Sequence, residues 1–125
     1  MEMRAFRRHA AVVVSSLAVV TAMSATLAPT ASADDQHGAI AVSPAHRVYG
    51  RALHASTKSA ADAGAMSACG YSDCKVLVDF TNCGAVAENA TMYMGGYGNT
   101  LTEAELAAVR NLGGGSGTIV AWGCN

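Results

Sequence analysis

The spacing of four cysteines constrains this chain more than any other feature of its sequence. Cys69, Cys74 and Cys83 fall within the stretch CGYSDCKVLVDFTNCGAVA, residues 69–87, and Cys124 is the penultimate residue. The spacing C-x4-C-x8-C contains no C-x2-C pair, which zinc sites and thiol–disulfide oxidoreductases usually contain. An even number of cysteines in an exported domain instead predicts structural disulfides. We therefore expect two disulfide bonds, no metal site and no cofactor.

The N-terminal segment predicts export. Arg4, Arg7 and Arg8 precede the apolar run AAVVVSSLAVVTAMSATLA, and the small residues ASA at 31–33 follow it. A basic region, an apolar region and a small-x-small cleavage site are the three parts of a secretory signal peptide. A membrane anchor is the alternative, but serines and threonines make the run only weakly apolar. We expect a signal peptide at residues 1–33, a short flexible N-terminus at 34–37 and one domain at 38–125, secreted or associated with the cell wall.

The charge of the mature part argues against two classes of partner. Loss of residues 1–33 removes three arginines and one glutamate, so the formal net charge changes from −1 to −3. Binding to a phosphate backbone depends on the number of lysines and arginines that contact it. Surface attachment of a helix to a membrane needs a basic stripe, which the mature part lacks. We expect neither nucleic acid nor, after signal cleavage, a membrane as the partner.

Alternating apolar residues and turn residues predict six strands and two helices in residues 38–125. Val76, Val78 and Phe80 are expected on one face of their strand. Thr102 and Glu105 are expected to form a capping box at the start of the second helix. The expected strands are 38–43, 48–53, 75–80, 84–87, 92–98 and 118–124, and the expected helices run from Ser56 or Thr57 to about Ala68 and from Thr102 to about Leu112.

The order of these elements predicts an internal repeat. GAIAVS at residue 38 is followed about 46 residues later by GAVAEN, and each is followed by a strand, a helix and a further strand. One ββαβ unit cannot bury its own apolar face, whereas two units can share a core. We expect an α+β domain of two repeated units, about 38–82 and 84–125, with both helices packed on one β-sheet. Three disulfide connectivities are open; this arrangement favours Cys69–Cys74 and Cys83–Cys124.

These residues resemble a known family. GAIA near residue 38, the cysteine-containing segment at 69–87, the glycines before the second helix and the terminal AWGCN occur in the order typical of the domain of unknown function 4189. The chain is most similar to the small secreted actinobacterial branch of that family, represented in mycobacteria. The resemblance implies a secreted, disulfide-bonded α+β domain with no established catalytic activity. It also implies that a role as a host-directed effector, including one at mitochondria, is worth considering.

No motif in the sequence predicts catalysis. Serine, histidine and aspartate all occur, but G-x-S-x-G and similar nucleophile motifs are absent. The histidines His37, His46 and His54 are expected on the surface. Solvated positions are also expected for the acidic residues that could pair as a glycosidase acid and base, which are Asp62, Asp73, Asp79, Glu103 and Glu105. We expect no enzyme activity.

An apolar, aromatic cluster beside glycines is the best candidate for binding. Met92, Tyr93, Met94 and Tyr97 are residue types that suit protein interfaces, although alternate members of a strand also pack in a core. We expect a secreted, non-enzymatic protein-interaction domain, with a host-directed effector as its most specific form. The alternatives are a small inhibitor of an extracellular hydrolase, a structural protein of the cell envelope and, least favoured, an uncharacterised hydrolase or redox enzyme.

Overall fold

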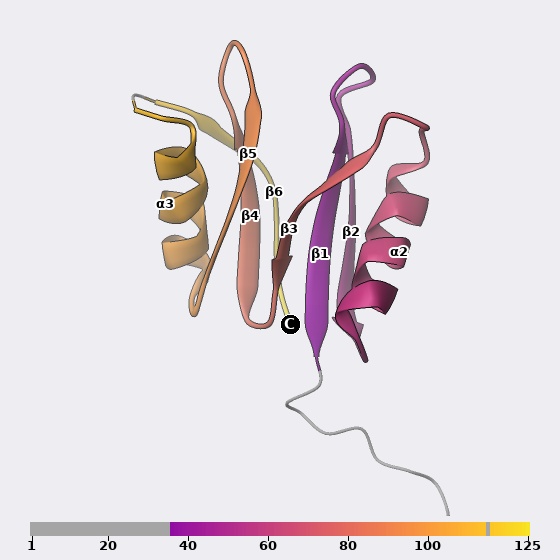
Figure 1. Cartoon of the computed structure of the whole chain (residues 1–125). Coiled ribbons are helices and arrows are strands. Elements are labelled where there is room, and N and C mark those ends of the chain that lie inside the picture. Colours follow the sequence, from indigo (N-terminus) through magenta and orange to yellow (C-terminus); the bar gives the residue numbers. More distant parts are fainter. Residues whose placement is uncertain (1–35, 115) are drawn as a thin grey trace, which may run out of the picture. The chain divides into compact units, whose positions relative to one another are not determined.

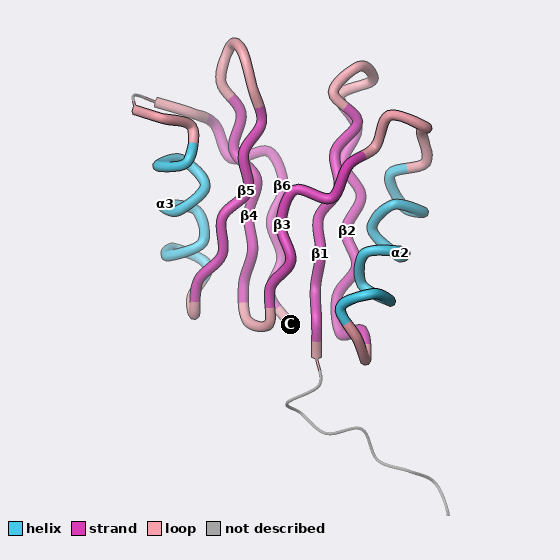
Figure 2. Tube along the Cα trace, viewed as in Figure 1, coloured by secondary structure: helices cyan, strands magenta, loops and turns pink. Residues whose placement is uncertain are grey.

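The computed structural model describes residues 36–114 and 116–125 (Figure 1). The expected signal peptide at 1–33 lies outside the described residues, as do the first residues of the expected mature terminus. The elements, coloured by type in Figure 2, are β1 (His37–Ser43), β2 (Val48–Ala55), α2 (Lys58–Cys69), β3 (Lys75–Phe80), β4 (Cys83–Glu88), β5 (Tyr93–Gly98), α3 (Leu101–Asn111) and β6 (Thr118–Cys124).

The six strands form two antiparallel sheets instead of the single sheet expected from the sequence. Sheet A has the order β2-β1-β3 and sheet B the order β5-β4-β6. Ile40 and Val78 of sheet A and Val86 of sheet B meet in one buried cluster between the two sheets. A single flat sheet would leave this set of apolar side chains without cover on one face, so stacking two sheets buries more apolar area.

Each sheet has a helix against its other face, α2 against sheet A and α3 against sheet B (Figure 1). Ala39 and Ala41 of β1 form a buried cluster with Ala61 and Ala65 of α2. In the second half, the alanines of β4 and α3 form the corresponding cluster. The central strands are therefore covered on both faces, with small side chains toward the helix and larger ones toward the other sheet. This explains why GAIAV and GAVA have no polar alternation.

Two glycines allow the helices to approach the sheets this closely. A Cβ added to Gly50 of β2 would lie 2.2 Å from the backbone nitrogen of Cys69 in α2. A Cβ added to Gly96 of β5 would lie 2.2 Å from the backbone nitrogen of Ala108 in α3. Any side chain at either position would force a helix away from its sheet.

Matching β-bulges change the side-chain alternation near one end of each sheet. Ile40 pairs with Val78 but Ala41 pairs with Val76, so Leu77 is an extra residue in β3. Val76 therefore packs beneath α2, whereas Leu77 and Val78 face the other sheet. The expectation that Val76 shares a face with Val78 and Phe80 is wrong, because a bulge shifts the two-residue period by one. Strand β6 has the same irregularity between its pairs with Val86 and Ala87.

The N-terminal cap of α3 also differs from the expected one. The Thr100 hydroxyl accepts a hydrogen bond from the Glu103 N–H at 3.2 Å, and the Glu103 carboxylate accepts one from the Asn99 N–H at 3.0 Å. The expected cap, Thr102 with Glu105, lies inside the helix. The sequence contains two overlapping T-x-x-E stretches, and only the tertiary position of the helix selects the first. At α2, Thr57 is the N-cap and its hydroxyl accepts the Ala60 N–H at 3.0 Å.

Two disulfides link Cys69 to Cys74 and Cys83 to Cys124. These are the two pairs favoured from the sequence. The first closes the short loop between α2 and β3, and the second joins directly opposite residues of β4 and β6. The two halves share their element order and strand order; a repeat at the level of the sequence stays a prediction. Among the described residues, no helix is both long and apolar enough to cross a membrane.

Candidate functional site

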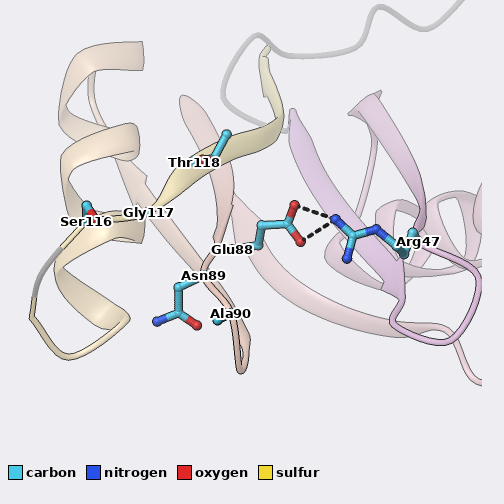
Figure 3. Close-up of a pocket in the computed structure, with 7 residues that line it drawn as sticks. All are labelled: Arg47, Glu88, Asn89, Ala90, Ser116, Gly117 and Thr118. Atoms are coloured by element: carbon cyan, nitrogen blue, oxygen red, sulfur yellow. Dashed lines mark hydrogen bonds and ion pairs between the residues drawn. The ribbon is translucent and has the colours of Figure 1, made fainter.

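A cleft lies where the β1–β2 turn of sheet A meets the β4–β5 turn of sheet B. It consists of two adjoining cavities of about 610 and 310 Å³, which share Arg47, Glu88, Asn89 and Ala90. Figure 3 shows the residues of the larger one, which is completed by residues 116–118 before and at the start of β6. Both volumes fall in the range of pockets that bind ligands or partner side chains. We call these two cavities the inter-sheet cleft.

An ion pair between the two sheets divides the cleft. The Arg47 nitrogen Nη2 lies 2.8 and 3.1 Å from the two carboxylate oxygens of Glu88 (Figure 3). The Glu88 side chain is 16% exposed and that of Arg47 is 65% exposed. Arg47 occupies a turn position with φ 56°, where its N–H donates to the Ser43 carbonyl at 2.8 Å. The tight turn after β1 therefore directs an exposed cation across to the other sheet.

The opposite wall of the cleft is shaped by Asn89. Its side-chain oxygen accepts hydrogen bonds from the N–H groups of Thr91 and Met92, both at 2.9 Å. The Asn89 N–H donates in turn to the Met92 carbonyl at 3.0 Å. An asparagine that holds its own turn in this way makes a compact, ordered loop. Met92, which is 43% exposed, is thereby presented at the rim.

The smaller cavity has a mixed lining of apolar and polar side chains, two of which are cations. Val42, Leu77, Met92 and Tyr93 contribute apolar surface, and Lys75 lies with Arg47 among the lining residues. Burial, and after it the nearby Glu88 carboxylate, raise the pKa of the Tyr93 phenol above its usual value of 10.0. The phenol is therefore neutral at physiological pH. Such a cavity suits an apolar group attached to a negatively charged one.

The structure brings together two of the four residues expected to form an interaction surface. Met92 and Tyr93 line the cleft. Met94 lies on the other face of β5 and packs with the cluster beneath α3. Tyr97 is 70% exposed but does not line the cleft. Neither Arg47 nor Glu88 was singled out from the sequence, because no local pattern pairs two charges that are 41 residues apart.

A serine, a histidine and an aspartate meet beside the first disulfide, which the sequence did not indicate. The Ser43 hydroxyl donates to an Asp73 oxygen at 2.6 Å and lies 3.1 Å from His46 Nδ1. The His46 ring stacks on Tyr71 with a centroid distance of 3.7 Å. Hydrogen bonds from Ser43, and after it from the Ala45 N–H, lower the pKa of Asp73.

The geometry of this cluster is that of a hydrogen-bond network that holds the β1–β2 turn in place. Ser43 is fully buried, and its proton is directed to Asp73 instead of to the histidine. A nucleophilic serine needs the reverse arrangement, with its proton directed to the histidine and its oxygen accessible to substrate. The network joins the β1–β2 turn to the loop between α2 and β3. It therefore supports the position of Arg47, the next residue after His46.

A second charged cluster lies between α2 and β3. Lys58 Nζ is 3.3 Å from carboxylate oxygens of both Asp62 and Asp79. The expectation that Asp79 lies in solvent is wrong, because its side chain, 29% exposed, lies on the helix side of β3. Burial, and after it Asp62, raise the pKa of Asp79. A hydrogen bond with Asp79 lowers the pKa of Asp62.

Residues 36–114 and 116–125 contain no group of three histidine, cysteine or acidic side chains placed to hold a metal ion. His37 begins β1 and His54 is an exposed residue of β2, whose ring Nδ1 lies 3.1 Å from the Gln36 side-chain oxygen. Glu103 and Glu105 belong to α3. The inter-sheet cleft is thus the place where two of the four expected interface residues, an inter-sheet ion pair and two cavities coincide.

Comparison with known proteins confirms the resemblance inferred from the sequence. The chain is 50% identical over 95 residues to Protein Rv1269c of Mycobacterium tuberculosis, covering 76% of this chain and 74% of that protein. It is 46% identical over 89 residues to the uncharacterized protein Rv1813c of the same organism, covering 71% of this chain and 60% of that protein. The NMR structure of Rv1813c matches with a TM-score of 0.60 at 42% identity, over 79% of each chain. Residues 37–124 match the family model itself, so this chain belongs to the family described as Domain of unknown function (DUF4189).

Proposed function

We propose that this protein is a secreted, non-enzymatic protein-interaction domain and that the inter-sheet cleft is its contact surface. The observation that carries the proposal is the coincidence of exposed Met92, the Arg47–Glu88 ion pair and two adjoining cavities at one end of the domain. Methionine adapts its shape to different partners, and arginine and tyrosine are typical of interface centres.

Secretion is supported by the signal-peptide pattern at residues 1–33 and by the two disulfides. Disulfides persist in oxidising compartments and are rare in a reducing cytosol. The most specific form of the proposal, a host-directed effector, follows from the family resemblance. The remaining forms, an inhibitor of an extracellular hydrolase and a structural protein of the envelope, also require a binding surface.

The lining of the smaller cavity indicates the chemistry of the partner. Val42, Leu77 and Tyr93 offer an apolar wall, while Lys75 and Arg47 add two cations against the single carboxylate of Glu88. The best fit is an extended protein segment that carries an apolar side chain next to an acidic one. The apolar group would occupy the cavity and the carboxylate would face the cations.

We also infer that the domain arose as two copies of one ββαβ unit. The identical strand order of the two sheets, the matching bulges and the equivalent roles of Gly50 and Gly96 support this inference. Under this inference the cleft has a simple origin, since it lies between the equivalent hairpin turns of the two units. A single unit would lack it.

Partner capture with a matched pair of variants tests the proposed surface. The oxidised protein is immobilised and offered a host-cell lysate, a bacterial envelope fraction and concentrated culture medium. Met92→Asp changes an exposed residue of the cleft, and Tyr97→Asp makes the same change at an exposed residue of the neighbouring strand outside it. We expect a protein retained by the wild type and by Tyr97→Asp but lost with Met92→Asp.

The identity and source of the retained protein separate the forms of the proposal. A host protein supports the effector, a hydrolase inhibited at one-to-one stoichiometry supports the inhibitor, and an envelope component supports the structural role. Equal retention by Met92→Asp would exclude the cleft as the contact surface. Turnover of a substrate that survives Met92→Asp but not Asp73→Asn would overturn the non-enzymatic reading.

A further inference from the structure

Strand β6 has an outer edge without a strand partner among the described residues. Sheet B has the order β5-β4-β6, so β6 pairs with β4 on one side only. Its sequence, TIVAWGC, contains no charged residue and no proline. Charges and prolines are the usual means by which natural sheets prevent their edges from pairing with another chain. The other edges carry such protection, with Arg51 in β2, Lys75 and Asp79 in β3, and the Gly95 carbonyl of β5 bound to the Asn111 side chain at 2.8 Å.

The register of the β4–β6 ladder shows which groups face the open edge. The Asn125 N–H donates to the Asn82 carbonyl at 2.8 Å, so Asn82 and Asn125 form a hydrogen-bonded pair. Hydrogen-bonded and non-hydrogen-bonded pairs alternate along an antiparallel ladder. Three positions further on, Trp122 lies opposite Ala85 in a non-hydrogen-bonded pair. Its N–H and carbonyl groups are therefore directed away from β4, toward the open edge.

One side chain from the other sheet covers this position. Arg51 of β2 donates from Nη1 to the Trp122 carbonyl, and its guanidinium carbon lies 5.6 Å from the centre of the Trp122 ring. The stem of Arg51 lies over Gly123, where an added Cβ would be 3.5 Å from Arg51 Cδ. The Trp122 side chain is nevertheless 48% exposed. A shallow cavity of about 310 Å³, lined by residues 49–51 and 120–122, runs between the two strands.

We propose that the outer edge of β6 is a strand-pairing surface for β6 of a second copy of this chain, and that Arg51 keeps this surface closed. Antiparallel pairing about a two-fold axis at Trp122 lets the two Trp122 residues exchange two main-chain hydrogen bonds, which replace the bond from Arg51 in each copy. The pairing is self-complementary because β6 carries no charge that would be repeated opposite itself. It also places two exposed tryptophan rings at the centre of the contact, where such residues contribute most to binding.

Sedimentation velocity of the purified protein with both disulfides formed tests this proposal. Arg51→Met keeps the stem over Gly123 and removes the guanidinium. Arg110→Met is the matched control, since Arg110 is an exposed arginine of α3 whose side chain, within the described part of the chain, bonds only to its own helix, at the Leu106 carbonyl. We expect the wild type and Arg110→Met to be monomers and Arg51→Met to dimerise with an association constant at least about tenfold higher.

Two further measurements locate the contact. Adding Trp122→Lys to Arg51→Met should restore the monomer, because paired lysines would repel each other across the two-fold axis. Hydrogen exchange at the Trp122 amide should slow in the dimer of Arg51→Met. If Arg51→Met fails to fold, Arg51→Lys takes its place, since it keeps the charge and the stem but loses the fork that reaches the carbonyl.

Four results would overturn the proposal. The first is an Arg51 variant that is folded and remains monomeric at every concentration at which the wild type is soluble. The second is a dimer that persists after Trp122→Lys, since that dimer would use another surface. The third is a wild type that already pairs through β6, because Arg51 would then not close the edge. The fourth is a peptide or foreign protein that protects the Trp122 amide of the monomer, since it would replace the second copy as the occupant.

Discussion

The two halves of the domain build the same three-stranded sheet with a helix on its outer face, but they hold it together differently. In both, a central strand of small and large apolar residues is covered on two faces, and a glycine in the next strand admits the helix. Within the first half, a disulfide closes a short loop, ion pairs link α2 to β3, and hydrogen bonds to Asp73 link the β1–β2 turn to the loop between α2 and β3. The second half instead has a disulfide that joins its first strand to its last.

This difference shows that one packing scheme tolerates two kinds of reinforcement. The alanine and glycine layer between helix and sheet is common to both halves, so it is the part that the geometry requires. Charged clusters and the position of the disulfide vary, because several solutions can hold a loop or a terminal strand in place. The following predictions test which of these features stabilises each half, in order of decreasing effect.

The disulfides should differ most in their effect. Replacing Cys83 and Cys124 by alanine is expected to lower the free energy of unfolding by about 4 kcal/mol, and replacing Cys69 and Cys74 by about 2 kcal/mol, because a longer closed loop restricts the unfolded chain more. The sequence separations are 41 and 5 residues. Denaturant unfolding of the two double variants measures the difference. Equal losses would show that local packing outweighs loop closure, and a tryptic fragment joining Cys69 to Cys83 would contradict the pairing itself.

The glycines beneath the helices should be equally intolerant in both halves. Gly50→Ala and Gly96→Ala are each expected to lower the free energy of unfolding by about 3 kcal/mol, because the new methyl group would collide with the helix backbone, which cannot rotate away. Gly123→Ala is the matched control, since the atoms nearest to its methyl group would belong to flexible side chains, Leu53 at 3.0 Å and Arg51 at 3.5 Å. Thermal unfolding of the three variants checks the order. A Gly50 variant as stable as the control would mean that the first half packs its helix less closely.

The helix caps should have a smaller and slightly unequal effect. Thr57→Ala and Thr100→Ala are each expected to lower the free energy of unfolding by about 1 kcal/mol, the usual value for loss of an N-cap hydroxyl. The cost should be larger at Thr100, because Glu103 completes a second hydrogen bond there with the Asn99 N–H. Thr102 lies inside the helix, two residues after the N-cap Thr100. Thr102→Ala should therefore change the free energy of unfolding by less than about 0.5 kcal/mol. Urea unfolding distinguishes the two threonines; a larger loss at Thr102 would restore it as the cap.

The charged clusters of the first half should give the smallest effects, with opposite pH dependence. Asp79 has a raised pKa in the folded state. Its contribution to stability is therefore complete below pH 3.8, the ordinary pKa of the group, and is lost as the pH rises through the pKa of the folded state. Asp79→Asn should therefore raise the melting temperature at neutral pH, by the equivalent of less than about 1 kcal/mol for this partly exposed group, and lose that advantage below pH 3.8.

Asp73 should show the reverse behaviour. Hydrogen bonds from the Ser43 hydroxyl and the Ala45 N–H lower the pKa of Asp73. Its contribution to stability is therefore present above pH 3.8 and is lost as the pH falls through the pKa of the folded state. Asp73→Asn should lower the melting temperature at neutral pH, and the difference from the wild type should shrink in acid. Calorimetry of both variants across this pH range provides the comparison. Parallel curves for the two variants would show that the two carboxyl groups do not differ in this way.

Much of the fold could be predicted because its signals are local. GAIAVS and GAVAEN predicted the central strands, the pair Ser56 and Thr57 predicted the start of α2, and the glycines at 113–115 predicted the end of α3. The cleft was predicted only in part. Met92 and Tyr93 stood out as apolar residues beside glycines, whereas Arg47 and Glu88 are ordinary surface charges until the two sheets bring them within 2.8 Å.

Some predictions failed because they depended on distant partners. A regular two-residue period placed Val76 with Val78, but the bulge opposite Ile40 and Ala41 is visible only when β1 and β3 are paired. Asp79 alternates away from the inter-sheet core as expected, yet the face that it occupies is covered by α2. Solvent exposure of one face of a strand cannot be predicted without knowing what packs on it.

The sequence by itself determined the order and type of the elements, the pairs of cysteines that could most easily meet, and the family, since these depend on short-range periodicity and on motif order. Only the tertiary structure decided that six strands form two sheets, that Ser43, His46 and Asp73 lock a turn, and that Arg51 lies over the edge of β6. The physical reason is that such contacts join residues 30 to 71 positions apart. Their formation depends on how apolar faces are buried across the whole domain, which no local pattern encodes.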